Sequence, residues 1–106
     1  MSSPAVLPEV ETEWALRHQP PYHVVLLNDD DHSFEYVITM LKELFGHPTE
    51  KGMDLAKTVD DDGRAIVFTG TREYAELKVE QIHAYGADPR IDRCQGSMSA
   101  VAEPAE

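Results

Sequence analysis

A run of polar side chains follows directly on the most apolar segment of the sequence. Residues 24–27 read Val-Val-Leu-Leu, and Asn28, Asp29, Asp30 and Asp31 come next. Amide and carboxylate oxygens accept hydrogen bonds, and the carboxylates also carry negative charge. Gathered at one turn, such side chains suit a cation that has hydrogen-bond donors, for instance an amine, or else a metal ion. This turn is the first candidate for a binding site.

A metal ion is one hypothesis for the acidic side chains. A second acidic run, residues 60–62, precedes Gly63. Solvated turns and helix ends are the ordinary explanation for such runs, and a calcium loop would need a glycine and a late glutamate at offsets that this chain lacks. His23 and His32 could add nitrogen ligands for a transition metal, but no two histidines stand four residues apart. An acidic metal-binding module remains an alternative, with no metal ligand assigned.

Catalytic motifs are absent from the sequence. There is no glycine-rich phosphate loop, no Gly-x-Ser-x-Gly and no His-Glu-x-x-His. We therefore expect no enzyme activity and no cofactor. Cys94 is the only cysteine, so neither an internal disulfide nor a cysteine-based zinc site can form. Twenty acidic and nine basic residues give a net charge of −11, which disfavours nucleic acid as a partner.

The length of 106 residues suits one domain with tails. The first residues lack the basic and apolar regions of a secretory signal, and no segment approaches the ~20 apolar residues of a membrane span. We expect a monomeric, soluble, cytoplasmic protein. Apolar periodicity and turn residues predict six elements: a strand at 22–27, a helix over 34–45 capped by His32 or Ser33, a helix from 48–50 to 60–62, a strand at 64–69, a helix from Thr71 to Gly86, and a weak strand at 90–94.

This order of elements predicts a two-layer α+β domain, β-α-α-β-α-β, with three helices on a three-stranded sheet. Residues 1–21 are rich in proline and acidic residues, which favours a flexible N-terminal extension. We expect the core domain to span residues 22–95. Residues 96–106 are small and polar and are expected to form a disordered tail.

Three blocks of the sequence resemble the ClpS family of adaptors for the Clp protease. Residues 22–30 read Tyr-His-Val-Val-Leu-Leu-Asn-Asp-Asp and are followed by Phe-Glu-Tyr-Val at 34–37. The other blocks are Asp-Gly-Arg-Ala-Ile at 62–66 and Thr-Arg-Glu-Tyr-Ala-Glu-Leu-Lys-Val at 71–79. The match covers roughly residues 20 to 94, and the fold of the family agrees with the predicted order of elements.

The resemblance implies an adaptor for N-degrons. Family members bind proteins whose first residue is bulky and hydrophobic and hand them to the AAA+ unfoldase of the Clp protease. The side chain of that residue enters an apolar pocket, and polar groups hold its α-ammonium. Carried over by position, the α-amino group would be bound by Asn28, Asp29 and Asp60. The pocket rim and wall would come from Asp30, His32, Phe34, Ala56, Val59 and Ile91.

The resemblance also assigns a docking face. Glu73 and Lys78 fall where the family contacts the N-terminal domain of the unfoldase, whereas charge alone would suggest only a solvated helix face. The extension at 1–21 matches the flexible segment that assists delivery. A ClpS-like regulator of the unfoldase that does not recognise N-degrons is the main alternative.

The chain departs from the family pattern at several pocket positions. Asp60 stands where the family has a histidine, and a carboxylate attracts an ammonium but cannot donate to a peptide carbonyl. Phe34 and Ala56 replace methionines, and residues 31–33, Asp-His-Ser, replace an aromatic residue, Thr and Pro. The last strand is also lengthened between Pro89 and Cys94. Asp60 is thus expected either to replace the histidine as an acceptor or to change the specificity, for instance towards a basic first residue, and His32 could partly replace the imidazole.

Overall fold

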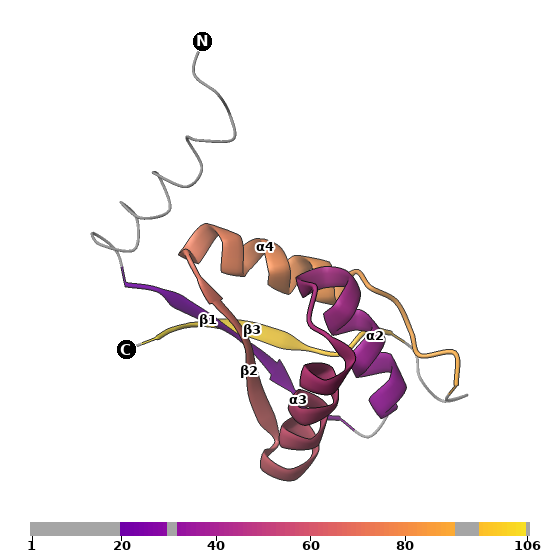
Figure 1. The fold of residues 1–106 in the computed structure, drawn as a ribbon. Coiled ribbons are helices and arrows are strands. Elements are labelled where there is room, and N and C mark those ends of the chain that lie inside the picture. Colours follow the sequence, from indigo (N-terminus) through magenta and orange to yellow (C-terminus); the bar gives the residue numbers. More distant parts are fainter. Residues whose placement is uncertain (1–19, 30–31, 91–95, 106) are drawn as a thin grey trace.

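The computed structural model describes residues 20–29, 32–90 and 96–105, and it confirms the α+β fold with three helices and a three-stranded sheet (Figure 1). The elements are, in order, β1 (Tyr22–Leu27), α2 (Phe34–Phe45), α3 (Thr49–Asp62), β2 (Arg64–Gly70), α4 (Arg72–His83) and β3 (Ala100–Pro104).

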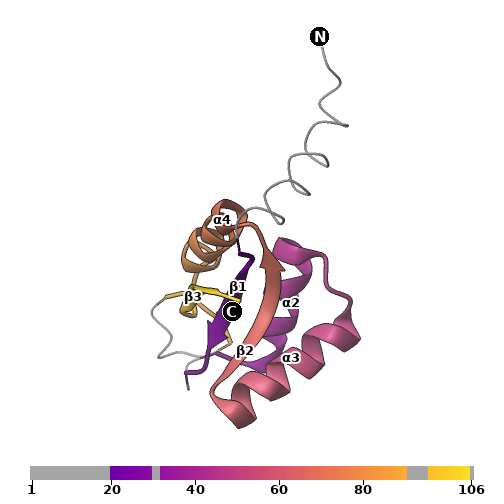
Figure 2. The same ribbon diagram turned by 90° about the vertical axis from the view of Figure 1, so that its left-hand side faces the viewer.

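The central strand of the sheet is β1, which pairs antiparallel with both β2 and β3. Val24 and Leu26 are fully buried and belong to a core that also includes residues of all three helices. Helices α2 and α3 pack against each other, and α4 lies over β1 and β3 (Figure 2). At Gly52 a Cβ atom would lie 3.3 Å from the Cα atom of Ile38, so the glycine permits the close approach of α3 to α2.

The helix ends are fixed by local capping interactions, which the structure shows. The Ser33 side chain caps α2 by accepting from the Tyr36 N–H, and Thr71 caps α4 by accepting from the Tyr74 N–H. Gly46 follows α2 with φ of 73°, a left-handed conformation that glycine adopts without strain. The capping role that the sequence left open between His32 and Ser33 therefore belongs to Ser33.

The prediction for the C-terminal segment is wrong. The third strand lies at Ala100–Pro104, inside the range that was assigned to a disordered tail, and Arg90 lies in a turn. Alanine has a low strand propensity, so Ala100 and Ala102 give only a weak signal for a strand. This strand is stabilised by its pairing with β1, which extends over its whole length. Met98 and Ala100 are also buried in the core. The core domain thus extends past residue 95; residues 91–94 lie outside the described part.

The expected N-terminal extension falls almost wholly on residues 1–19, which lie outside the described residues, and stays a prediction. In the part of the chain that the structure describes, no helix is long and apolar enough to span a bilayer.

Candidate functional site

Three segments that are distant in sequence meet where β1 ends. The Leu27 N–H donates to the Ser99 carbonyl and the Asn28 N–H to the Gly63 carbonyl, both at 3.0 Å. The exit of β1 is therefore fixed between the segment that leads into β3 and the end of α3. Asp60 is exposed in the last turn of α3, three residues before Gly63, or ~5 Å along the helix axis. The structure thus brings the turn at Asn28 and Asp29 towards the helix end that carries Asp60.

The carboxylate of Asp29 is held by a histidine. Nδ1 of His32 lies 2.7 Å from Oδ1 of Asp29, and Nε2 of the same ring lies 2.7 Å from the carbonyl oxygen of Gly96. The Asp29 side chain is 35% exposed, whereas that of His32 is 4% exposed. The carboxylate of Asp29 is therefore partly exposed to solvent, and the buried His32 ring fixes its orientation.

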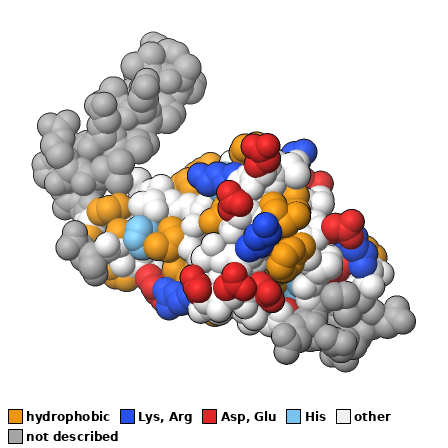
Figure 3. Space-filling view, turned by 60° about the horizontal axis from the view of Figure 1, so that its bottom comes forward, with side chains coloured by type: hydrophobic (Ala, Val, Ile, Leu, Met, Phe, Trp, Pro, Cys, Tyr) orange, Lys and Arg blue, Asp and Glu red, His pale blue; other side chains and the backbone are white. Residues whose placement is uncertain are grey.

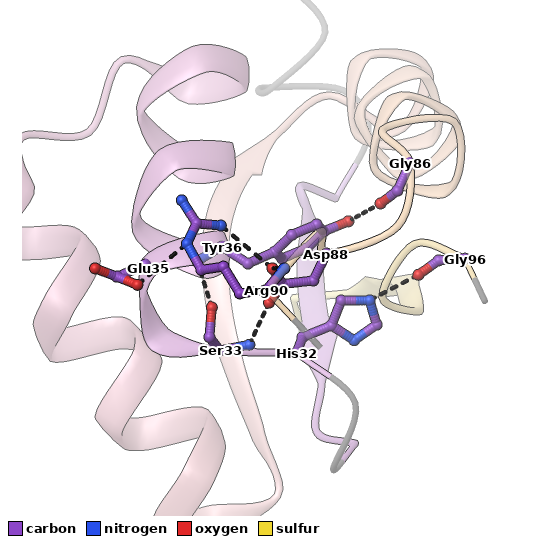
Figure 4. A network of polar contacts seen from close by, with 8 residues as sticks. All are labelled: His32, Ser33, Glu35, Tyr36, Gly86, Asp88, Arg90 and Gly96. Carbon is purple, nitrogen blue, oxygen red and sulfur yellow. Dashed lines mark hydrogen bonds and ion pairs between the residues drawn. The ribbon is translucent and has the colours of Figure 1, made fainter. Parts of the chain in front are cut away.

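A buried network beside this turn fixes the start of α2 (Figure 4). Asp88, which is 1% exposed, accepts from the Ser33 N–H at 2.7 Å and from the Arg90 N–H at 3.0 Å. Nη1 of Arg90 lies 3.2 Å from the same carboxylate, and its Nε lies 3.1 Å from Glu35. The network ties the loop after α4 to the residues that follow the candidate site.

The pKa of Asp88 reflects this network. Burial alone would raise the pKa of the carboxyl group, but the hydrogen bonds from Ser33 and Arg90 outweigh burial and lower it to about 2. The sequence analysis did not single out Asp88. The signal was weak because its main partner, Ser33, lies 55 residues away.

The proposed pocket residues take different positions. Phe34 is the first residue of α2 and is 38% exposed, close in sequence to His32. Ala56 and Val59 are each 2% exposed, on the inner face of α3 in the hydrophobic core. Asp30 and Ile91 lie outside the described residues. Asn28 and Asp29 follow β1, and Asp29 contacts His32. Phe34 begins α2, whereas Ala56 and Val59 lie in the core.

The candidate docking face on α4 contains exposed apolar side chains that sequence reasoning missed. Tyr74 is 48% and Leu77 43% exposed, and Glu73 is exposed beside them. Nζ of Lys78 donates to the Leu44 carbonyl at 2.6 Å and lies 5.3 Å from the centre of the Tyr74 ring. Lys78 thus has a structural contact with the end of α2 as well as its place on this face.

The surface charge agrees with the composition. Acidic side chains are spread among apolar and basic ones on the face in Figure 3. Within residues 20–29, 32–90 and 96–105, no three His, Cys, Asp or Glu side chains are grouped so as to hold a metal ion. The metal-binding alternative gains no support from these residues.

The described residues form a small α+β domain with the candidate site at the end of β1. The model of the family described as ATP-dependent Clp protease adaptor protein ClpS matches residues 17–89, which is more than half of the chain. The chain belongs to the ClpS family, and the resemblance seen in its sequence is confirmed.

Individual relatives agree with this assignment. An ATP-dependent Clp protease adapter protein ClpS of Thermosynechococcus vestitus is 35% identical over 80 residues, covering 74% of this chain and 85% of that protein. Another, of Pectobacterium carotovorum, is 40% identical over 72 residues, or 66% and 68% of the two chains. The structure of Agrobacterium tumefaciens ClpS2 bound to L-phenylalaninamide superposes with a TM-score of 0.69 at 28% identity, covering 80% of this chain and 96% of that one.

Proposed function

We propose that this protein is an adaptor that binds the first residue of substrate proteins, with a preference for bulky hydrophobic residues, and delivers them to a Clp-type AAA+ unfoldase. The observation that carries the proposal is the oriented, partly exposed carboxylate of Asp29 beside Asn28 and the exposed ring of Phe34. The ligand of the similar Agrobacterium protein supports it, because L-phenylalaninamide has a free α-amino group, an aromatic side chain and a blocked carboxyl group.

The α-ammonium group has three N–H donors and needs acceptors. In this proposal Asn28 supplies an amide oxygen, and Asp29 and Asp60 supply carboxylates. Hydrogen bonds to charged groups contribute about 1.5–3 kcal/mol each. An acetylated amine loses both the charge and two of the donors, so the site distinguishes a true N-terminus from an internal residue. The role requires binding alone and no catalytic step.

The side chain of the first residue would enter a pocket whose rim is formed by Asp30, His32 and Phe34. Ala56, Val59 and Ile91 would supply its inner wall. Burial of a Leu or Phe side chain contributes about 1.5–3 kcal/mol. Ala56 is small, and its short side chain leaves room for a large first residue.

The second surface of the adaptor would be α4. Glu73 and Lys78 would contact the N-terminal domain of the unfoldase, and the exposed Tyr74 and Leu77 add the apolar area that protein interfaces need. In this proposal the protein acts as a monomer in the cytoplasm, and residues 1–21 assist delivery.

Fluorescent peptides that begin with Leu, Phe, Tyr, Trp, Arg or Ala, each with a free or an acetylated amine, test the proposal. We expect micromolar or tighter binding, about −8 kcal/mol, for free-amine peptides with a bulky first residue only. Binding of Arg alone would show a redirected pocket. No binding of any peptide would leave the regulator of the unfoldase as the function.

Asp60→Ala tests the position where the chain departs from the family. We expect the dissociation constant of a Leu peptide to rise about fivefold, since an exposed carboxylate contributes less than a buried one. Asp61→Ala removes the same charge from the next residue and is the matched control. Equal affinities for the two variants would remove Asp60 from the site.

A further inference from the structure

The ring of His32 lies between two oxygen atoms that can only accept hydrogen bonds. One is the carboxylate oxygen of Asp29 and the other the backbone carbonyl of Gly96, each 2.7 Å from a ring nitrogen. A neutral imidazole has a single N–H, so it can donate to one of these oxygens and turns a lone pair towards the other. Both contacts are favourable together only when both ring nitrogens carry a proton.

The surroundings of His32 accommodate a positive charge. Asp29 is the contacting carboxylate. From α2, the ring of Tyr36 lies 4.5 Å from the His32 ring. The nearby guanidinium of Arg90 is balanced by Asp88 and Glu35.

We propose that His32 is a positioning residue of the amine site and that it releases a proton when a substrate ammonium binds. The inference rests on the proposed function, because the ammonium must reach Asp29. A second cation at the Asp29 carboxylate repels the imidazolium, and like charges at this range favour loss of the proton. The Nε2 proton passes to solvent, and one N–H remains at Nδ1 to hold Asp29 in place.

The proton that is released is the one on Nε2, which is hydrogen-bonded to the Gly96 carbonyl. Once Nε2 is deprotonated, its lone pair faces the Gly96 carbonyl, and the contact at 2.7 Å becomes repulsive. Gly96 lies four residues before β3, so occupation of the amine site weakens a tie between the site and the segment leading into that strand. His32 would thus link amine binding to the backbone at Gly96.

Calorimetric titration of a Leu peptide in two buffers of different ionisation enthalpy counts the protons released. At about pH 5.5, where histidine is ordinarily protonated and the peptide α-amine is too, we expect release of about one proton. Because binding releases a proton, the affinity should fall as the pH is lowered below neutrality, by up to tenfold per pH unit. His32→Gln should release no proton and show a flat profile. His23→Gln, which removes a histidine bonded to Thr69 elsewhere on the sheet, should behave like the unchanged protein.

An unchanged proton count in His32→Gln, or no release from the unchanged protein, would overturn the proposal. The ring nitrogens can also be observed by NMR without a ligand. At about pH 5.5 we expect two protected ring N–H signals from His32 and loss of the Nδ1 signal in Asp29→Ala, which has no side-chain acceptor. A single signal would overturn the doubly protonated bridge. If two signals are present but no peptide binds at any pH, the proposed function fails and the coupling fails with it, whereas the bridge stands.

Discussion

We expect replacement of Asp29 by Asn to weaken the binding of a peptide with a free N-terminal Leu or Phe by about a hundredfold, or about 2.7 kcal/mol. The substitution keeps the shape of the side chain and removes its charge. It also replaces the charged acceptor of the His32 contact by a neutral amide oxygen, which accepts a weaker hydrogen bond. Fluorescence anisotropy with free and acetylated peptides measures the change, and the acetylated peptide should bind weakly to both proteins.

The matched control for this prediction is Asp61→Asn. It makes the same change of charge at an exposed position of α3, so long-range effects of net charge are equal in the two variants. We expect its affinity to match that of the unchanged protein. Equal affinities for Asp29→Asn and Asp61→Asn would show that the ammonium is held elsewhere.

We expect replacement of Asp88 by Asn to lower the free energy of unfolding by about 3 kcal/mol at neutral pH. The carboxylate accepts from the N–H groups of Ser33 and Arg90 and from the Arg90 guanidinium. An amide in its place has one acceptor oxygen fewer and brings N–H donors towards these donors. Urea denaturation followed by circular dichroism measures the loss.

The dependence of stability on acid pH tests whether the ionised Asp88 carboxylate is the cause of this loss. The pKa of Asp88 is lowered from 3.8 to about 2 by its hydrogen bonds, in spite of burial. Because this pKa is lower in the folded than in the unfolded state, the ionised carboxylate stabilises the fold fully at pH values above the unfolded pKa. This contribution, about 2 kcal/mol, is lost as the pH falls through the folded pKa of about 2. The stability curves of the unchanged protein and Asp88→Asn should therefore converge in acid.

Asp54→Asn is the control for stability, because Asp54 is exposed on α3 and its replacement makes the same chemical change. We expect a loss within ~0.5 kcal/mol, which is usual for surface positions. An Asp88→Asn variant as stable as Asp54→Asn would contradict the role given to the buried network.

The parts of the fold that the sequence predicted depend on local signals. Ser33 and Thr71 cap helices by bonds to residues three positions along, and Gly46 ends a helix by its own backbone conformation. Such interactions can be read from a few neighbouring residues. By contrast, β3 is rich in alanine and is stabilised by pairing with β1, almost 80 residues before it in the chain. A weak local preference gave no sign of that pairing.

The candidate site divides in the same way. The run from Asn28 to Asp29 was visible as an acidic turn after an apolar strand. The contact between His32 and Gly96 joins residues 64 positions apart, so the sequence placed His32 at the pocket rim but gave no sign of this contact. Its bridging role depends on the course of the chain after α4, for which no motif provides a signal.

The pairing of Tyr22 with Pro104 has a consequence for how the protein can be handled. The Ala105 N–H also donates to the Pro21 carbonyl at 2.9 Å, so residues 21 and 105 lie together at the end of the sheet where β1 begins. Asn28 and Asp29 lie at the other end of β1, ~20 Å away for a strand of six residues. A fluorophore or surface anchor attached just before Pro20 would therefore be joined to the domain far from the proposed amine site. Removal of residues 100–105 would take β3 out of the sheet and leave one side of β1 unpaired.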